Sequence, residues 1–188
     1  IEEGVKIIAV YDDIADYILV KQGGKINAVG TPDKPIVMTS EKEEPGAWVG
    51  IHICGRAHTN AEGGKGSSEI GGAVYGGNDD ADNSGTLQYI RLEYTGFAFD
   101  EEHEANGISF YGVGNGTIVD HCQAYKGSDD GFEFFGGSVN VSNLVAVSCS
   151  DDSFDWTEGW NGKGTNLVAY QEAESTLGYD CDCLMECD

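Results

Sequence analysis

The chain has 188 residues, 40% of them hydrophobic, so it can bury a sizeable core within one domain. Its 33 acidic and 10 basic residues give a net charge of -23, and such a surface repels nucleic acid and anionic membranes. No stretch reaches the ~18 apolar residues of a membrane span. We therefore expect neither nucleic-acid binding nor direct membrane insertion, and neutral sugars, cationic partners and divalent metal ions remain as ligand classes.

The upstream part of the chain reads as short strands separated by turns. It starts at Ile1 rather than Met, so we expect a piece of a longer parent protein. Residues 23–40 predict two strands joined by a turn, and residues 47–55 predict another strand. Two long excursions follow, at residues 56–85 and, with an acidic sequence, at residues 95–105. Long loops on a rigid scaffold often carry function.

The downstream part repeats with an offset of 22 residues, so that SDDGFEFFGG returns as SDDSFDWTEG. Aligned segments place apolar residues in columns that alternate with polar neighbours, as half-buried strands require. The columns are Ile90, Cys122, Leu144 and Leu167; Leu92, Ala124, Ala146 and Ala169; and, in a second strand, Ile108, Phe132 and Phe154. Two strands and tight glycine turns per repeat predict an all-β parallel β-helix, a solenoid with coils ~4.8 Å apart. This domain covers residues 1–171, and residues 172–188 form a tail or cap.

Several segments also carry a family resemblance, namely AWVGIHICGRA, DNSGTLQYIRLEYTGF, NGISFYGVGNGT and, most specifically, DDGFEFFGG. In this order they resemble a largely uncharacterised family of right-handed, pectate-lyase-like β-helix proteins from Gram-negative bacteria. The resemblance runs from about Gly23 to Tyr170. It implies a right-handed solenoid and a secreted or outer cell-surface location, and it implies no established activity. The cysteines, Cys149 and the final cluster especially, depart from the family pattern.

Two pairs of acids recur one coil apart on the outward side of the repeat, Asp129 with Asp151 and Glu133 with Asp155. Carboxylates ~4.8 Å apart repel by roughly 3.5 kcal/mol at an effective dielectric of ~20. Solvent and salt, a proton or a cation must relieve this repulsion. Calcium, with oxygen ligands at ~2.3 to 2.6 Å, could be shared by two coils. A solvated acidic face is the alternative.

The inward column of the same turns contains Asp130, Asp152 and Asn106. Because one member is neutral, we expect these side chains to accept backbone N–H bonds at the strand entrance.

A second calcium candidate is the loop DADNSG. Asp80, Asp82 and Ser84, followed by Gly85, match the first half of a calcium-loop pattern. The match is incomplete, because Arg91 stands where the pattern needs a bidentate Glu. An acidic turn capped by its own side chains is the simpler alternative.

The remaining cysteines and the aromatic residues give weaker signals. Cys181, Cys183 and Cys187 are spaced C-x-C-x3-C without a His or second pair nearby for zinc. In an exported protein we expect disulfides, with Cys149 or Cys54 as candidate partners.

Outward or loop-edge aromatic rings beside carboxylates suit sugars, which offer C–H groups and hydroxyls together. The candidate ligand-binding residues are Phe135, Tyr111 and Trp160, and packing under a loop is the alternative for each.

Two function classes follow from these features. The first, which we favour, is a non-catalytic exported or cell-surface module, stabilised by calcium, for adhesion or for binding glycans. The second is a polysaccharide lyase or glycoside hydrolase on the acidic face, using Glu133, Asp155 or Arg91. A lyase needs a positioned base, and only Arg91 and Lys126 lie near the acidic columns. A hydrolase needs two carboxyl groups in different environments, which stacked identical acids do not offer.

Overall fold

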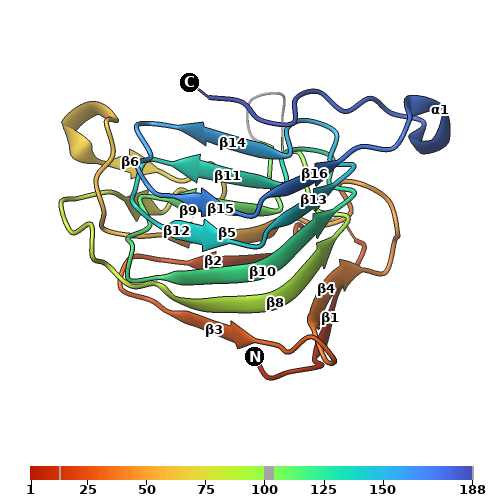
Figure 1. Cartoon of the computed structure of the whole chain (residues 1–188), viewed down its shortest axis with the longest axis horizontal. Coiled ribbons are helices and arrows are strands. Elements are labelled where there is room, and N and C mark those ends of the chain that lie inside the picture. Colours follow the sequence, from red (N-terminus) through yellow and green to blue (C-terminus); the bar gives the residue numbers. More distant parts are fainter. Residues whose placement is uncertain (13, 100–103, 188) are drawn as a thin grey trace.

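The computed structural model describes residues 1–12, 14–99 and 104–187, so part of the acidic excursion at 95–105, including His103, lies outside the described residues. The chain winds through stacked coils of parallel strands (Figure 1). The elements are β1 (Lys6–Ala9), β2 (Tyr17–Val20), β3 (Ile26–Val29), β4 (Ile36–Ser40), β5 (Gly50–Cys54), β6 (Gly66–Ser67), β7 (Val74–Tyr75), β8 (Gly85–Glu93), β9 (Ile108–Tyr111), β10 (Ile118–Tyr125), β11 (Phe132–Phe135), β12 (Asn140–Ser142), β13 (Val145–Val147), β14 (Phe154–Thr157), β15 (Gly164–Thr165), β16 (Val168–Tyr170) and the short helix α1 (Glu174–Leu177).

Most strands form two parallel sheets, of which the larger, sheet A, is bent, and β6 and β7 form a separate two-stranded antiparallel sheet. Sheet B has the order β14-β11-β9-β5-β2. In sheet A the first half of β8 pairs with β3 and its second half with β4, while β10 pairs in the same way with β12 and β13. The bends fall at Tyr89 and His121, whose φ angles are 51° and 52°. Each coil therefore has three faces rather than the two strands that the sequence predicts.

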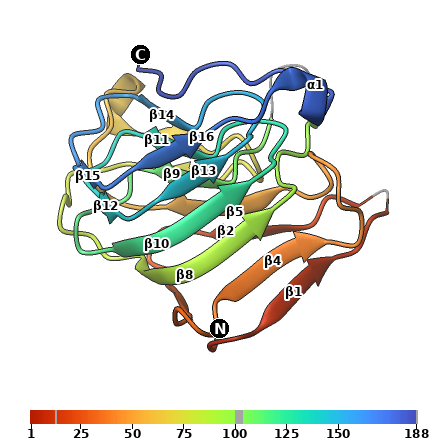
Figure 2. The ribbon, with the colours of Figure 1, turned by 45° about the vertical axis from the view of Figure 1, so that its right-hand side comes forward.

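The register of the coils agrees with the sequence columns. Cys122 pairs with Ile90, and Ala124 pairs with Leu92 and Ala146. Phe132 lies between Ile108 and Phe154 in sheet B. All of these side chains are buried in one core that runs along the axis of the solenoid. Figure 2 shows the coils from the side, with β1 and β4 at one end and β14 and β16 near the other.

Aromatic rings form a ladder inside sheet B. The rings of Phe110 and Phe134 stack at 4.9 Å, Phe134 and Trp160 at 4.5 Å, and Phe132 and Phe154 at 5.5 Å. Burying a ring of this size contributes roughly 1.5 to 3 kcal/mol. The ladder therefore fixes the strand entrances of sheet B, where the acids lie.

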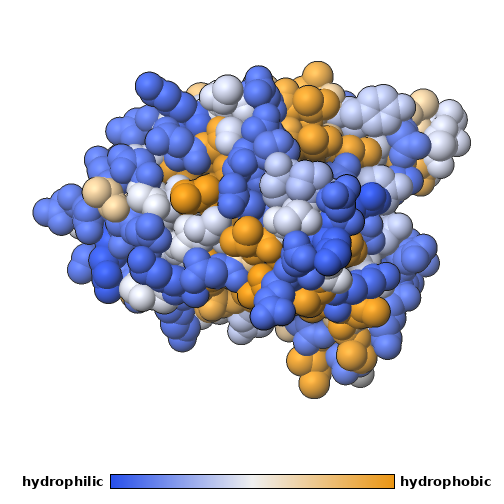
Figure 3. Space-filling model, turned by 60° about the horizontal axis from the view of Figure 1, so that its bottom comes forward, coloured by the Kyte–Doolittle hydropathy of each residue, from blue (hydrophilic) through white to orange (hydrophobic). Residues whose placement is uncertain are grey.

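The two ends of the solenoid differ. At the first coil, large hydrophobic side chains are exposed, among them Ile8, Val10 and Ile14. Figure 3, which brings the lower end of Figure 1 forward, shows hydrophobic patches among hydrophilic residues on that face.

At the last coil the tail covers the edge of β14. The N–H of Ser153 donates to the Cys183 carbonyl at 3.1 Å, and the N–H of Glu186 donates to the Phe154 carbonyl at 3.1 Å. Cys183 also donates its N–H to the Asp152 carboxylate at 2.9 Å. These contacts give the tail the position of a cap.

All six cysteines are free, so the expected disulfides are not formed in this structure. Cys54, Cys122 and Cys149 are buried. Among the described residues no helix has the length and apolar character needed to cross a bilayer.

Candidate functional site

An acidic pocket of about 230 Å³ lies where the strands of sheet B begin. Apart from one asparagine, every residue that lines it is acidic. The lining residues are Glu69, Glu104, Asn106, Asp129, Asp130, Glu133, Asp151, Asp155 and Glu186.

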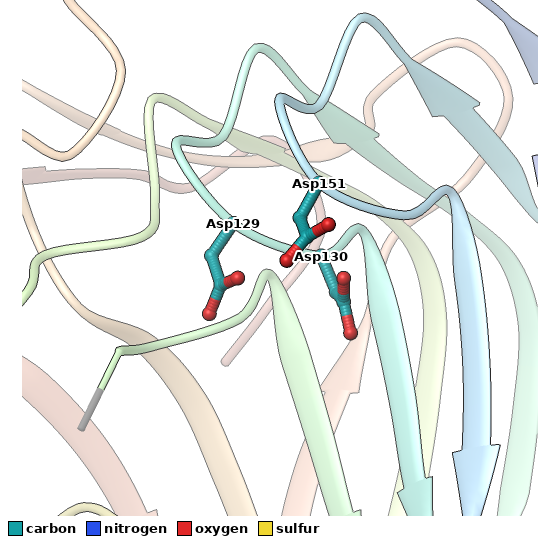
Figure 4. A group of neighbouring side chains, drawn as sticks. All are labelled: Asp129, Asp130 and Asp151. Carbon is teal, nitrogen blue, oxygen red and sulfur yellow. The ribbon is translucent and has the colours of Figure 1, made fainter. Parts of the chain in front are cut away.

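The coil repeat supplies the centre of this pocket. Glu133 and Asp155 face each other in paired positions of β11 and β14. Asp129 and Asp130 lie in the turn before β11, and Asp151 lies one coil later in the turn before β14. Figure 4 shows these three aspartates gathered from two successive turns at the strand entrances.

Glycines and backbone hydrogen bonds hold these turns close together. A Cβ at Gly107 would lie 2.4 Å from the Gly131 carbonyl oxygen, so the turns approach too closely for a side chain there. The N–H of Asp152 donates to the Asp130 carboxylate at 2.8 Å, and Asp152 accepts from the tail as described above. The two inward aspartates thus accept backbone N–H bonds as predicted, whereas the prediction is wrong for Asn106, whose Oδ1 accepts no hydrogen bond from the described residues.

Burial makes the pocket electrostatically unusual. Burial raises the pKa of Asp129 to about 7, with Glu104 and Asp151 contributing further repulsion. Burial and then Asp129 raise the pKa of Asp130 to about 9. Burial, followed by nearby carboxylates of which Glu69 is the largest, raises the pKa of Glu133 to about 11. The repulsion predicted for stacked acids contributes to the raised pKa values of Asp129 and Glu133, but burial is the larger cause for both.

Asn106 adds a neutral oxygen to this set. Its side chain is 1% exposed, and its Nδ2 donates to Glu133 and to the Ser109 hydroxyl. Its Oδ1 is buried without a hydrogen-bond partner among the described residues. An unsatisfied amide oxygen inside a protein costs about 1 to 3 kcal/mol. A cation or a hydrogen-bond donor bound to this oxygen would therefore stabilise the folded protein.

The spacing of the acids fits a cation. Three groups each offer oxygen atoms within 4.8 Å of one another: Asp129, Asp130 and Asp151; Asp130, Glu133 and Asp155; and Asp152, Asp155 and Glu186. Calcium takes 6 to 8 oxygen ligands at about 2.3 to 2.6 Å. Carboxylate oxygens crowded at this distance match its needs in both chemistry and reach.

Comparison with known proteins assigns this β-helix to a family. The family model described as a pectate-lyase-like β-helix domain matches residues 1–188. The chain belongs to this family. No curated protein and no solved structure matches it.

Within this pectate-lyase-like β-helix domain, the structure brings together four residues that the sequence singles out. Asp129, Asp151, Glu133 and Asp155 all line the pocket. The alternative of a solvated acidic face is wrong for Asp129 and Asp155, which are only 9% and 7% exposed.

Four further lining acids were not predicted as ligands: Asp130, which the sequence assigns to the inward column, and three acids outside the repeat. Glu69 and Glu104 come from the two excursions and Glu186 from the tail, so none of them carries the repeat signal. The high acidity of the 95–105 excursion and of the tail could have indicated Glu104 and Glu186, but this signal does not extend to Glu69.

The DADNSG loop lies elsewhere on this β-helix and uses its acids locally. The Asp80 carboxylate accepts from the His58 N–H at 3.0 Å and contacts His58 Nδ1 at 2.8 Å. The Asp82 carboxylate accepts from the Arg56 N–H at 3.0 Å. Ser84 donates its N–H to the Thr117 hydroxyl. The groups of three potential acidic ligands found among the described residues include neither aspartate.

Arg91, the candidate lyase base, is on β8 of sheet A and is absent from the lining of the acidic pocket. It pairs with Glu93, and its guanidinium lies 4.7 Å from the centre of the Tyr125 ring.

The proposed ligand-binding aromatics are covered to different degrees. Tyr111 is fully buried, between Tyr75 at 5.2 Å and Phe135 at 4.4 Å, so its ring is not presented to a ligand. The sequence could not predict this because Tyr75 comes from the excursion. Trp160 is half-buried and donates its Nε1–H to the Val139 carbonyl at 3.1 Å. Phe135 is also half-buried.

Proposed function

We propose that this protein is a non-catalytic β-helix module, exported or held at the cell surface, with a carbohydrate-related role in adhesion or glycan binding. The pectate-lyase-like family supports the carbohydrate-related role. We propose further that a calcium ion in the acidic pocket stabilises the module. The observation that carries this second part is the convergence of carboxylates with the buried, unpartnered Oδ1 of Asn106.

A cation in this pocket would join parts of the chain that are far apart in sequence. Asp129 and Asp151 belong to successive coils, Glu69 to an excursion and Glu186 to the tail. Neutralising their repulsion favours the folded state, because the unfolded chain holds these acids apart.

Calcium titration by isothermal calorimetry tests the proposal. We expect saturable binding to the wild-type protein and a loss of about tenfold or more in affinity for Asp129→Asn with Asp151→Asn, since affinity follows the ligand charge count. A matched control, Glu2→Gln with Glu41→Gln, removes two exposed acids outside the pocket and should bind as the wild type does.

A third variant separates the two candidate sites. Asp80→Asn with Asp82→Asn should leave the affinity unchanged if the pocket is the site. A loss in this variant alone would instead assign calcium to the DADNSG loop, and no binding in any sample would contradict the cation proposal.

Glycoside hydrolysis is a second candidate, because the acids do not share one environment. Glu133 is held neutral by burial, whereas Asp151 is exposed and its pKa is raised less strongly. Differentiated carboxyl groups are what an acid and a base require. Release of reducing sugars that disappears in Glu133→Gln, with the fold intact, would favour this function. Neither Arg nor Lys lines the pocket in the described part of the chain, which disfavours a lyase there.

A further inference from the structure

The two ends of the solenoid leave strand edges open. β1 is the first strand of sheet A and β2 the first strand of sheet B, and each pairs with only one strand among the described residues. At the other end β16 pairs only with β13 in the same part of the chain. Figure 2 shows β1 at one end of the molecule and β16 with the tail near the opposite end. Such edges present unpaired N–H and C=O groups to a further strand.

The order of the strands lets a second copy of the chain continue the solenoid. Along the chain the coils alternate between the sheets, beginning with β1 in sheet A and β2 in sheet B. They end with β14 in sheet B and β16 in sheet A, after which the tail lies along the free edge of β14. The tail takes the next position of sheet B, so the β1 strand of another copy can take the next position of sheet A, and its β2 strand then follows on the tail.

Side chains of β1 and β16 belong to one apolar column of sheet A. From the first coil to the last, the column contains Ile7, Met38, Leu92, Ala124, Ala146 and Ala169. Its two end members, Ile7 and Ala169, are only partly buried against the core. In the continued register, Ile7 of one copy would lie on Ala169 of another copy and close the core between them.

The backbone of β1 and β16 agrees with this register. The carbonyl groups of Val5 and Ala9 accept N–H groups from the β4 side, so the alternate residues Lys6 and Ile8 direct their N–H and C=O groups to the free edge. In β16 the residues on either side of Ala169 bond to the coil before, which turns the Ala169 groups to the free edge. With Ile7 on Ala169, the free groups of Ala169 meet those of Lys6 and Ile8, as a parallel ladder requires.

The two ends also offer exposed apolar side chains and complementary charges. The first coil exposes Ile8, and the last coil exposes Tyr170, which falls opposite Ile8 in the continued register. Residues 1–42 contain five of the ten basic residues and seven acids, whereas residues 139–188 contain one base and ten acids. Beside β2, Lys21 and Lys25 line a groove of about 640 Å³ that has no acidic lining among the described residues. Lysines of the first end can therefore pair with acids of the last end.

We infer that copies of this chain bind one another end to end, with β1 of one copy pairing in parallel with β16 of another. A second copy supplies the missing strand in the correct sheet and register, together with the complementary charge. The two surfaces are different, so the contact is heterologous and extends into rows of copies instead of closing as a dimer. The inference goes beyond the proposed function and depends on neither calcium nor a glycan.

Sedimentation velocity over a series of protein concentrations, in calcium and in chelator, tests this inference. We expect the wild type to form dimers and longer species in both, because neither β1 nor β16 lines the acidic pocket. Ile8→Pro removes the N–H that would bond to another copy and no hydrogen bond to β4, so it should keep the fold and associate at least about tenfold more weakly. Ile8→Ala keeps this N–H and should associate far more strongly than Ile8→Pro.

Mixing two blocked variants tests the geometry of the contact. Ile8→Pro blocks the first end and Ala169→Pro blocks the last end, so each alone should stay monomeric. Their equimolar mixture should form a dimer and nothing longer, because one free end of each kind remains. Dimers of Ala169→Pro alone would indicate contact between two first ends and would overturn the inference. A monomeric wild type, or a mixture that stays monomeric, would overturn it as well.

Hydrogen exchange of the wild type gives a measurement that does not rely on the folding of any variant. The amides of Lys6, Ile8 and Ala169 should gain protection as the protein concentration rises, because these groups form the new ladder. Amides of the β6–β7 hairpin, which belongs to the 56–85 excursion, should not change and serve as the control. Exchange at β1 and β16 that is independent of concentration would contradict end-to-end binding.

Discussion

At the scale of single residues, the direction in which an acidic side chain points determines whether it accepts a backbone hydrogen bond or faces other carboxylates. Asp130 and Asp152 point into the turns and accept backbone N–H groups from the next coil or the tail. Glu133, three residues after Asp130, faces other carboxylates, and burial raises its pKa to about 11. Asp130 therefore has two roles, because it accepts a backbone N–H group and also lines the acidic pocket with Glu133.

His58 provides a pH-dependent contact between the 56–85 excursion and the turn after β14. Its Nδ1 contacts Asp80 at 2.8 Å and its Nε2 contacts the Gly159 carbonyl at 2.9 Å. Burial lowers its pKa, but Gly159 and Asp80 outweigh burial and raise the pKa above its ordinary value. The stabilisation is therefore complete below the unfolded pKa of about 6.5 and is lost as pH rises through the folded pKa.

We expect NMR titration to give His58 a pKa above 6.5, and His58→Gln to reduce the loss of stability across that pH range. A His58 resonance that titrates at or below the unfolded value would contradict this account.

Cys122 should be inert despite being free. It is 1% exposed, and burial raises its pKa to about 12. We expect maleimide to label the exposed Cys187 rapidly in the native protein and Cys122 only after unfolding. Mass spectrometry of the labelled peptides measures both rates, and fast native labelling of Cys122 would place it outside the core.

At the scale of elements, the sequence predicts the strand columns but not the bend in sheet A. Hydrophobic alternation identifies Ile90, Cys122 and Leu144 as one column because burial imposes it directly. The bend depends on single left-handed residues, and Tyr89 and His121 give no compositional sign of it. Asn143 is the exception, since asparagine favours that conformation. The prediction of two strands per coil therefore missed a face.

The aromatic ladder should dominate the stability of sheet B. Phe134 is 2% exposed and stacks on both Phe110 and Trp160. Phe134→Ala should reduce the free energy of unfolding by about 3 to 5 kcal/mol, since it leaves a cavity. Ile118→Ala on β10, where the side chain is 50% exposed, should cost far less, and denaturant titration compares the two. Similar losses in the free energy of unfolding for the two variants would mean that the aromatic ladder does not dominate the stability of sheet B.

At the scale of the whole molecule, the solenoid provides the scaffold, and the non-repeating segments complete the acidic pocket. Asp129, Asp151, Glu133 and Asp155 could be predicted because they recur at the coil offset. Glu69, Glu104 and Glu186 could not, because their positions depend on how the excursions and the tail fold back. A sequence repeat predicts which residues of successive coils are neighbours. It does not predict where the segments outside the repeat lie.

The raised pKa values predict how pH changes stability when calcium is absent. An unfolded aspartate ionises near pH 3.9, whereas Asp129 and Asp130 have pKa values of about 7 and 9 in the folded protein. Between these limits the folded state holds more protons, so stability falls as pH rises. Calcium replaces those protons, so its stabilising effect should grow from pH 5 to pH 8 in thermal melts. A calcium effect that shrinks with rising pH would contradict proton competition.

The most direct test of the proposal that calcium binds and stabilises the solenoid is its melting temperature at pH 7 in calcium and in chelator, with sodium matching the ionic strength. An ion that binds only the folded state adds ~2.7 kcal/mol at 100 times its Kd. This corresponds to a rise of roughly 5 to 10 °C for a domain of this size. We predict this rise for the wild type and for Glu2→Gln with Glu41→Gln, and its loss in Asp129→Asn with Asp151→Asn. If the wild type melts at the same temperature in calcium and in chelator, the pocket is not a metal site, and protons and solvent relieve the repulsion between its acids.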